Sequence, residues 1–382
     1  MLKVGLIGIG NAGNQVATLA SEKLGIDVFA INSSRQDFDT IPDSIPKKLI
    51  GDEKGAGKNR SDAKAFLKKQ IMDLMSDEDF KNFMVSKEVV YICSSTGGGT
   101  GSGMAPIMSS IIGNSFKNSD GSDKIIILIG ILPTLLEAYS TQVNTLDYLT
   151  ELYQTLEDPT YMLYDNDKLS KKSTCEMMKS INLSIVDDIS VMMGMHTPTT
   201  PYASIDEKDM KVILNTQGRI VIASLTDLKE KDLDETTIED LLINDIKTNT
   251  HSELQRDKVV IRTGVITNLS ENISSTFNTH IPKIQEFIGS PVDEFEHIYV
   301  NSDRKMPNNV FLIMSGLSKI NDRIHKINDR IEEIEEAQKG NDDDDDALSE
   351  HDVNKLNEKR NYRRSSENSD VNLKDIFSRF NA

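Results

Sequence analysis

The chain has 382 residues, a formal net charge of −18 and a hydrophobic share of only 37%, which favours a soluble protein of two ordinary domains with a solvated segment. The acidity disfavours a non-specific grip on nucleic acid or on an anionic membrane. No run approaches eighteen consecutive apolar residues, the N-terminus lacks a signal-peptide pattern, and the two cysteines suit a reducing compartment, so we expect a cytoplasmic protein with no membrane partner.

The first half of the chain alternates apolar runs with helix-forming stretches. The apolar runs predict strands over 2–9, 28–31, 89–93 and 124–132. The stretches between them predict a helix after the first strand, an amphipathic helix over 62–75 and a further helix over 104–112. Because these strands are apolar along nearly their whole length, they indicate a parallel sheet covered by helices on both faces.

A long helical pattern over 173–195 ends at a segment with two prolines, HTPTTPY, residues 196–202. A second, smaller α/β region follows, with strands expected over 220–224, 259–267, 297–301 and 309–314, and helices expected from Asp206, over 237–249 and over 274–287. The predicted fold class is therefore α/β, with two domains joined by the long helix. We place the first domain at 1–195, including that helix, and the second at 196–316.

Beyond the second domain, apolar residues recur three and four positions apart. They are Leu317, Ile320, Ile324, Ile327, Ile331 and Ile334. This spacing predicts an amphipathic helix over 317–340, whose apolar seam either packs on the chain itself, which we favour, or forms a coiled coil. The acidic run that begins at Asn341 predicts the end of this helix, and 341–382, which carries basic residues and a short apolar patch, is expected to be a disordered tail.

Two glycine-rich segments each leave a predicted strand and open a predicted helix. They are GIGNAGN, residues 8–14, and GGGTGSG, residues 97–103. Backbone N–H groups at such a helix start bind phosphate, and parallel strands bring both turns to the same edge of the sheet. Together with a third segment, GAG at 55–57, they can surround a triphosphate chain.

Two other interpretations of these glycines are open. The 97–103 segment could be a flexible linker, but linkers do not normally lie between a buried strand and a helix. The first segment also fits the dinucleotide pattern G-x-G-x-x-G, which would make the protein a nicotinamide-dependent oxidoreductase. That pattern requires an acidic residue at the end of the second strand, where this chain has Asn32, so the dinucleotide interpretation is weakened.

GGGTGSG resembles the signature of the tubulin/FtsZ superfamily of GTPases, and the resemblance extends over roughly residues 2 to 316. It implies a GTP-binding domain on a parallel sheet, a long central helix, a smaller α/β domain, and GTP or GDP with Mg²⁺ as cofactors, without a protein metal site. The candidate nucleotide-binding residues are Gly10, Asn11, Asn14, Asn32, Gly55, Ala56, Gly57, Gly97, Gly98, Gly99, Thr100, Gly101, Ser102, Glu137, Asn166 and Asn182.

The segment that begins SIDEKD, residues 204–209, resembles the catalytic acidic loop of the same superfamily. Asp206 and Asp209 are three residues apart at a predicted helix start, so both carboxylates can face one direction, although helix capping would account for one of them. In the superfamily, subunits stack head to tail and this loop completes the nucleotide pocket of the next subunit. The resemblance therefore implies that Asp209 is the catalytic acid and Asp206 its accessory.

Several residues differ from the pattern of the cell-division members of this superfamily. Residues 138–144 contain no arginine, Ile9 stands where cell-division members have glycine, and Ser204 replaces the asparagine that usually opens the acidic loop. Together with the final helix and basic tail, these features look like TubZ, the branch that moves plasmid and phage DNA. This likeness implies a cytomotive filament whose tail binds a small DNA-binding adaptor, and so contacts centromere-like DNA indirectly. An FtsZ-like cell-division GTPase and a nucleotide-gated structural filament are the alternatives.

Overall fold

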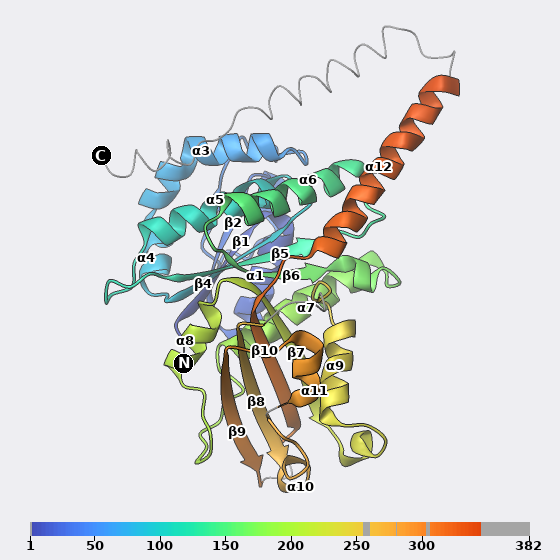
Figure 1. Cartoon of the computed structure of the whole chain (residues 1–382). Helices are drawn as coiled ribbons and strands as arrows, with labels where there is room; N and C mark the ends of the chain where they lie inside the picture. The colour runs from blue at the N-terminus through green and yellow to red at the C-terminus, as the bar shows by residue number, and fades with distance from the viewer. Residues whose placement is uncertain (1, 255–259, 280, 303–305, 345–382) are drawn as a thin grey trace.

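The structure is a computed structural model that describes residues 2–254, 260–279, 281–302 and 306–344. Six parallel strands form its N-terminal part (Figure 1). They are β1 (Val4–Ile9), β2 (Asp27–Asn32), β3 (Lys47–Leu49), β4 (Val89–Ser95), β5 (Ile125–Leu132) and β6 (Thr160–Asp165). They lie in the order β3-β2-β1-β4-β5-β6, and every neighbouring pair is parallel. The carboxyl ends of these strands therefore share one edge of the sheet.

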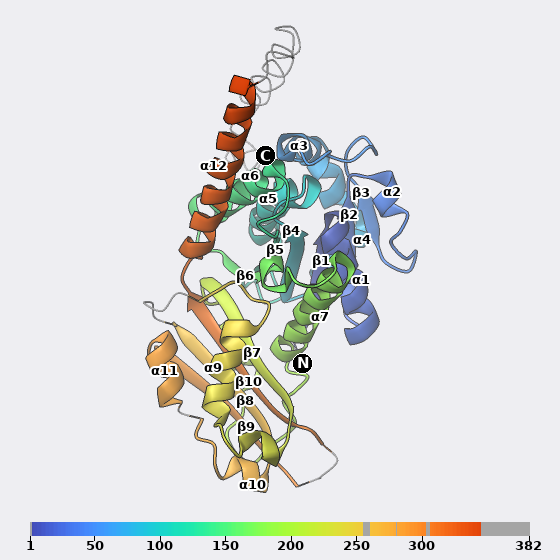
Figure 2. The same ribbon diagram turned by 90° about the vertical axis from the view of Figure 1, so that its right-hand side faces the viewer.

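Helices cover both faces of this parallel sheet (Figure 2). One face carries α1 (Gly10–Leu24) and α7 (Thr174–Met192), and the other carries α3 (Arg60–Ser76), α4 (Glu78–Val85), α5 (Thr100–Ser115) and α6 (Tyr139–Thr150). Successive strand residues point to opposite faces, so Leu6 of β1 belongs to the core under α1 and Ile7 to the core under α5. Because both faces are buried, the strands are apolar throughout, and the predicted architecture is confirmed.

Four further strands continue the sheet in the C-terminal part of the described chain. They are β7 (Gly218–Leu228), β8 (Arg262–Ser270), β9 (Asp293–Asn301) and β10 (Asn308–Leu317). β10 lies between β7 and β8 and is antiparallel to both, whereas β8 and β9 are parallel. The full order is β3-β2-β1-β4-β5-β6-β7-β10-β8-β9, but β6 and β7 share only two residue pairs, so the two parts of the sheet meet at a narrow junction.

Both faces of the C-terminal part are also covered. α9 (Ile238–Thr248), α10 (Glu271–Ser274) and α11 (Pro282–Ile288) pack on one face. α8 (Glu207–Leu214) and the end of α7 pack on the other, in a core that is continuous with the one under α1. The long helix α7 thus joins the two parts of the molecule through a shared apolar core.

The last helix, α12 (Asn321–Asp344), begins against the body of the protein and then extends away from it (Figure 1). The apolar positions at its start are covered by the chain itself, because Ile320, just before the helix, and Ile327 are 1% and 0% exposed. Further along, Tyr139 of α6 donates a hydrogen bond to Glu335 at 2.7 Å. The first part of the apolar seam therefore packs on its own chain, which is the arrangement we favoured.

The structure corrects several predicted elements. The helix expected over 274–287 is two helices, because Pro282 starts α11 after a break. α5 begins at Thr100, inside the glycine-rich segment. The connection after β2 contains the short α2 (Arg35–Phe38) as well as β3. α12 runs four residues into the acidic run, to Asp344, because Gly340 weakens a helix without ending it.

The rest of the predicted tail, 345–382, lies outside the described residues. Within the described ranges, none of the helices combines the length and apolar character needed to cross a bilayer.

Candidate functional site

The two glycine-rich segments touch each other at the carboxyl edge of the parallel sheet. A Cβ atom on Gly10 would lie 3.1 Å from the backbone nitrogen of Gly101, and one on Gly101 would lie 2.8 Å from the carbonyl oxygen of Ile9. Gly10 also has a φ of +72°, which side chains disfavour. These two glycines are therefore required for the close approach of two backbone segments that are distant in the sequence.

Most other glycines of the 97–103 segment also have packing roles. A Cβ on Gly97 would lie 2.4 Å from Thr141 Cγ2, and one on Gly99 would lie 3.0 Å from both the Cβ of Ala56 and the Cα of Lys58. Gly98 differs, because no described atom lies within 4 Å of the position that its Cβ would take. Gly98 therefore faces open space beside the segment at 55–57, where a ligand could approach the backbone.

The helices that start at these segments have uncapped N-termini. Neither Ile9, which precedes α1, nor Gly99, which precedes α5, accepts a hydrogen bond through a side chain, and neither first turn contains an acidic residue. In contrast, side chains cap α3, α4, α7 and α8. The first N–H groups of α1 and α5 thus lack intrahelical partners at one place, which is the arrangement that binds phosphate.

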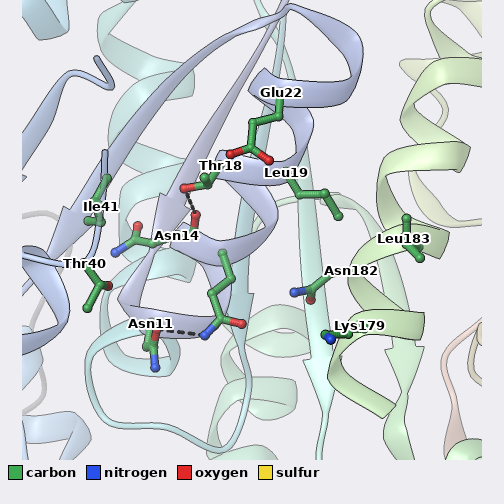
Figure 3. Close-up of a pocket in the computed structure, with 11 residues that line it drawn as sticks. Asn11, Asn14, Thr18, Leu19, Glu22, Thr40, Ile41, Lys179, Asn182 and Leu183 are labelled. Atoms are coloured by element: carbon green, nitrogen blue, oxygen red, sulfur yellow. Dashed lines mark hydrogen bonds between the residues drawn. The ribbon is translucent and has the colours of Figure 1, made fainter. Parts of the chain in front are cut away.

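A cavity of about 460 Å³ lies between α1 and α7, beside these helix starts (Figure 3). Asn11 and Asn14 line it from α1, and Lys179 and Asn182 line it from α7. Asn14 is 3% exposed and its Oδ1 has no hydrogen-bond partner among the described residues. The volume and the convergent amides suit a planar heterocycle with donors and acceptors on its edge.

Three other predicted residues lie at the same edge of the sheet. Asn32 ends β2, and its Oδ1 accepts the N–H groups of Ser33 and Ser34 at 2.8 and 3.2 Å, while its buried Nδ2 lacks a partner within the described chain. Asn166 follows β6, and its buried Oδ1 is likewise unpartnered there. Glu137 differs, because its Oε1 accepts the N–H of Thr134 at 3.0 Å. Ligand contact by Glu137 would use the other oxygen.

Hydroxyls of the glycine-rich segment are engaged within the chain. Thr100 Oγ1 lies 2.6 Å from Ser33 Oγ, which joins the start of α5 to the end of β2. Ser102 donates to the carbonyl of Gly98. These contacts hold the segment in one conformation.

The sequence did not reveal the role of Asn144 of α6, whose side chain forms hydrogen bonds to both the segment that contains Lys58 and the glycine-rich segment at 97–103. Its Nδ2 lies 2.8 Å from the carbonyl oxygen of Lys58 and 3.2 and 3.1 Å from those of Gly97 and Gly98. The side chain is 8% exposed. No local pattern marks this residue, because its partners come from two segments that are 46 and 86 residues distant in the chain.

The acidic loop forms a reciprocal capping box at the start of α8. Asp206 Oδ1 accepts the N–H groups of Lys208 and Asp209 at 2.7 and 2.9 Å, and Asp209 Oδ2 accepts the N–H of Asp206 at 3.1 Å. Capping therefore involves both carboxylates, not one as we expected. Each contributes one oxygen to the box, so the other oxygen of each carboxylate takes no part in it.

The acidic loop lies at the opposite edge of the sheet from the glycine-rich segments. Lys211 of α8 pairs with Glu88 at 2.9 Å, which lowers the pKa of that carboxyl, and Glu88 immediately precedes β4. Since β4 has seven residues and a strand rises about 3.3 Å per residue, its two ends are roughly 20 Å apart. One molecule therefore does not bring Asp206 and Asp209 to the other candidate residues.

The described residues contain no cluster of three His, Cys, Asp or Glu side chains that could hold a metal ion. A divalent cation at this site would depend on oxygens of the ligand for most of its coordination.

Comparison with known proteins identifies related sequences. Residues 3–174 match the family model described as "Tubulin/FtsZ family, GTPase domain". The tubulin-like protein CetZ2 of Haloferax volcanii is 25% identical over 59% of this chain and 62% of its own length. The cell division protein FtsZ 1 of Methanocaldococcus jannaschii is 26% identical over 58% of each chain. These matches thus span less than two thirds of the curated relatives.

Solved structures share the fold over most of the chain. TubZ of the Clostridium botulinum phage c-st is 20% identical, with a TM-score of 0.66, and the match covers 87% of this chain and 97% of that one. A protofilament of H. volcanii CetZ2 with bound GTPγS is 19% identical, with a TM-score of 0.68 over 88% and 100% of the two chains.

Proposed function

We propose that this protein binds GTP, assembles head to tail and hydrolyses GTP between subunits, on the premise that residues 3–174 match the family model described as "Tubulin/FtsZ family, GTPase domain". The base would occupy the cavity between α1 and α7, and the phosphates would lie on the free N–H groups of α1 and α5. A Mg²⁺ ion bound with the phosphates would neutralise charge that develops during phosphoryl transfer.

The separation of the two edges of the sheet is the observation that carries this proposal. The phosphate-binding loops and the acidic loop are roughly 20 Å apart along β4, because a strand rises about 3.3 Å per residue. A second subunit that places its α8 edge on the glycine edge of the first would close this gap. Such a contact joins different faces of identical subunits, so it repeats and builds a filament.

In this arrangement Asp209 acts on the nucleotide of the neighbouring subunit. One of its oxygens holds the capping box of α8, which fixes the carboxylate. The other oxygen is available to orient the attacking water and to accept its proton as the bond to the terminal phosphate forms. Asp206 fixes the same helix start and adds negative charge beside Asp209.

Replacing Asp209 with Asn tests this role while preserving the capping acceptor. We expect Asp209→Asn to pellet with GTP as the wild type does, and to release phosphate about 100-fold to 10,000-fold more slowly, the usual range for a lost general base. Glu207→Gln is the matched control, because it removes one acidic charge from the same helical turn. Normal turnover by Asp209→Asn would contradict the assignment, and tight binding of NAD without GTP-dependent assembly would favour an oxidoreductase.

For the biological role we propose DNA partition through an adaptor. The shared fold with phage TubZ and the basic end of the chain support this role. Removing residues after Gly340 should leave GTP-dependent sedimentation intact and abolish capture of a small DNA-binding protein encoded beside the gene. If capture is unchanged, the tail is not the docking segment. Localisation of the protein at division sites would favour the cell-division alternative, which the FtsZ relatives support.

A further inference from the structure

Residues 198–205 lead from the end of α7 to Asp206, which begins the capping box of α8. They lie along β9, the last strand of the sheet. The N–H of Ile298 donates to the carbonyl of Ala203 at 2.9 Å, and Thr200 Oγ1 donates to the carbonyl of Ile298 at 2.5 Å. The segment is therefore held on this edge strand by bonds that use only the backbone of β9.

The side chain of His297, on β9, joins the two ends of the same segment. Its Nε2 lies 3.0 Å from the carbonyl oxygen of Pro198, and its Nδ1 accepts the N–H of Ile205 at 3.4 Å. Because a carbonyl oxygen only accepts, Nε2 carries the ring proton and Nδ1 keeps a free lone pair. One neutral tautomer thus satisfies both partners, whereas a protonated ring would turn a second donor toward the N–H of Ile205.

The surroundings of His297 favour this neutral ring. The residue is 2% exposed, and burial lowers the pKa of its imidazole, although the hydrogen bond to Pro198 opposes this fall. The segment 198–205 contains no charged side chain, and neither do residues 263–269 of β8, the strand that pairs with β9. A buried imidazole that is held in one tautomer is a stiff link between β9 and the segment.

This link reaches the chain one residue before the acids. Ile205 also packs on β8, since its Cδ1 lies 3.6 Å from the position of a Cβ on Gly264. Asp206 follows Ile205 directly and exchanges backbone hydrogen bonds with Asp209 in the capping box. A shift of Ile205 would therefore move both carboxylates together.

We propose that His297 is a positioning residue for GTP hydrolysis, which holds the capping box of α8 where Asp209 can act on the nucleotide of the neighbouring subunit. This inference rests on the proposed function, because it gives His297 a part only in the hydrolysis step. His297 does not line the cavity between α1 and α7. Its replacement should therefore change turnover and leave GTP affinity unaltered.

Two substitutions with opposite effects on volume and on hydrogen bonding test the proposal in the full-length protein. His297→Phe keeps a ring of similar size and lacks an acceptor for Ile205. His297→Asn is smaller but places an amide oxygen near the position of Nδ1. We expect His297→Phe to bind GTP and to sediment with GTP as the wild type does. At saturating GTP it should turn over about 10-fold to 100-fold more slowly, because small displacements of a catalytic group cost that much.

His297→Asn should bind GTP, sediment and retain most of the turnover, because it restores the acceptor. A role in packing alone predicts the reverse order, with His297→Phe active and His297→Asn impaired, and that order would overturn the inference. Equal turnover in the two variants, or weaker GTP binding by His297→Phe, would overturn it as well. His325→Phe is the matched control, because it makes the same change at an exposed position of α12.

Failure of the inference is distinguishable from failure of the proposed function. If both variants assemble and hydrolyse GTP as the wild type does, only the role of His297 is wrong. If the wild type neither binds GTP nor sediments with it, the proposed function fails and the inference falls with it.

Discussion

The glycines of the 97–103 segment differ in what surrounds them. Gly97 lies against Thr141, where an added Cβ would approach Cγ2 to 2.4 Å, whereas the space beside Gly98 is open. Gly98 has no positive φ, so alanine fits its backbone conformation. Glycine is therefore required at position 97 for packing within the chain, whereas at position 98 it leaves room for a ligand to approach the backbone.

We expect Gly98→Ala to fold like the wild type and to bind GTP at least roughly tenfold more weakly, because its methyl group occupies the space of the phosphates. Gly97→Ala should instead lose about 1–3 kcal/mol of stability through overpacking. Urea unfolding and calorimetric nucleotide titration would measure both effects. Gly113→Ala, on α5, is the control, since the nearest atom to its added Cβ is Ile126 Cγ1 of β5, 3.9 Å away. Full affinity in Gly98→Ala would place the phosphates elsewhere.

At the residue scale, the sequence predicted the glycine-rich segments and the amides of the cavity but not the groups that position them. The segments were found because a run of glycines between a buried strand and a helix is rarely accidental. Asn144 and Thr141 gave no signal, since each contacts the site across many residues of chain. Lys58 was visible beside the glycines, but its place against Gly99 depends on the fold.

At the element scale, α12 is anchored to the parallel sheet by a buried ion pair. Arg323 Nε lies 2.9 Å from Asp165 Oδ2, and both side chains are less than a tenth exposed. Arg323 also donates to the carbonyl of Pro133, in the segment that leads to Glu137. Burial raises the pKa of Asp165, and the charge of Arg323 partly opposes that rise. α12 thus contacts the edge of the sheet that carries the candidate nucleotide site.

Replacing Arg323 with Met should be strongly destabilising, by about 3–5 kcal/mol at pH 8, because it leaves the Asp165 carboxylate buried without its partner. An acid with a raised pKa in the folded state stabilises the fold fully below its unfolded-state pKa and loses that contribution as the pH rises through the folded-state pKa. Without Arg323 the pKa of Asp165 rises further, so the loss of stability should be smaller at pH 5 than at pH 8.

Urea unfolding at the two pH values measures this difference. Arg330→Met, on the same helix but with a partly exposed pair to Glu333, should cost less than about 1 kcal/mol at either pH. Adding Asp165→Asn to Arg323→Met should recover part of the stability. A loss that is equal at both pH values would show that packing, rather than the unpaired carboxylate, dominates.

Elements with local signals were predictable, and elements that depend on distant pairing were not. The parallel strands are recognisable because burial on both faces leaves uninterrupted apolar runs. The insertion of β10 between β7 and β8 is set by contacts between segments that are far apart in the chain, which the spacing of apolar residues does not record. The break between α10 and α11 did have a signal, Pro282, which we did not use.

At the scale of the whole molecule, two contacts help to hold the parts of the sheet together, in addition to the apolar core that they share. One is the short pairing of β6 with β7. The other is a buried cluster in which Tyr164 of β6 donates to Asp188 of α7 at 2.7 Å, and His251 Nε2 lies 2.8 Å from the same oxygen. Because α7 packs on both parts, the acidic edge and the glycine edge keep a fixed separation within one subunit.

This fixed separation predicts that two impaired variants restore activity when they are mixed. Asp209→Asn keeps an intact nucleotide pocket and lacks the acid, whereas Gly98→Ala keeps the acid and has an impaired pocket. A Gly98→Ala subunit can place its intact Asp209 against the GTP-loaded pocket of an Asp209→Asn subunit. The interface between these two subunits then contains both the acid and an unimpaired pocket. We expect phosphate release by an equimolar mixture to exceed several-fold the sum of the two proteins assayed separately at the same concentrations.

The matched control is a mixture of Gly98→Ala with a protein that carries both substitutions. This mixture contains the same faces and the same amount of intact acid, but no unimpaired pocket, so it should stay at the level of its components. Equal rates in the two mixtures would mean that pocket and acid act within one subunit. That result would require the roughly 20 Å between the two ends of β4 to close by a rearrangement inside the molecule, which the continuous core beneath α1, α7 and α8 opposes.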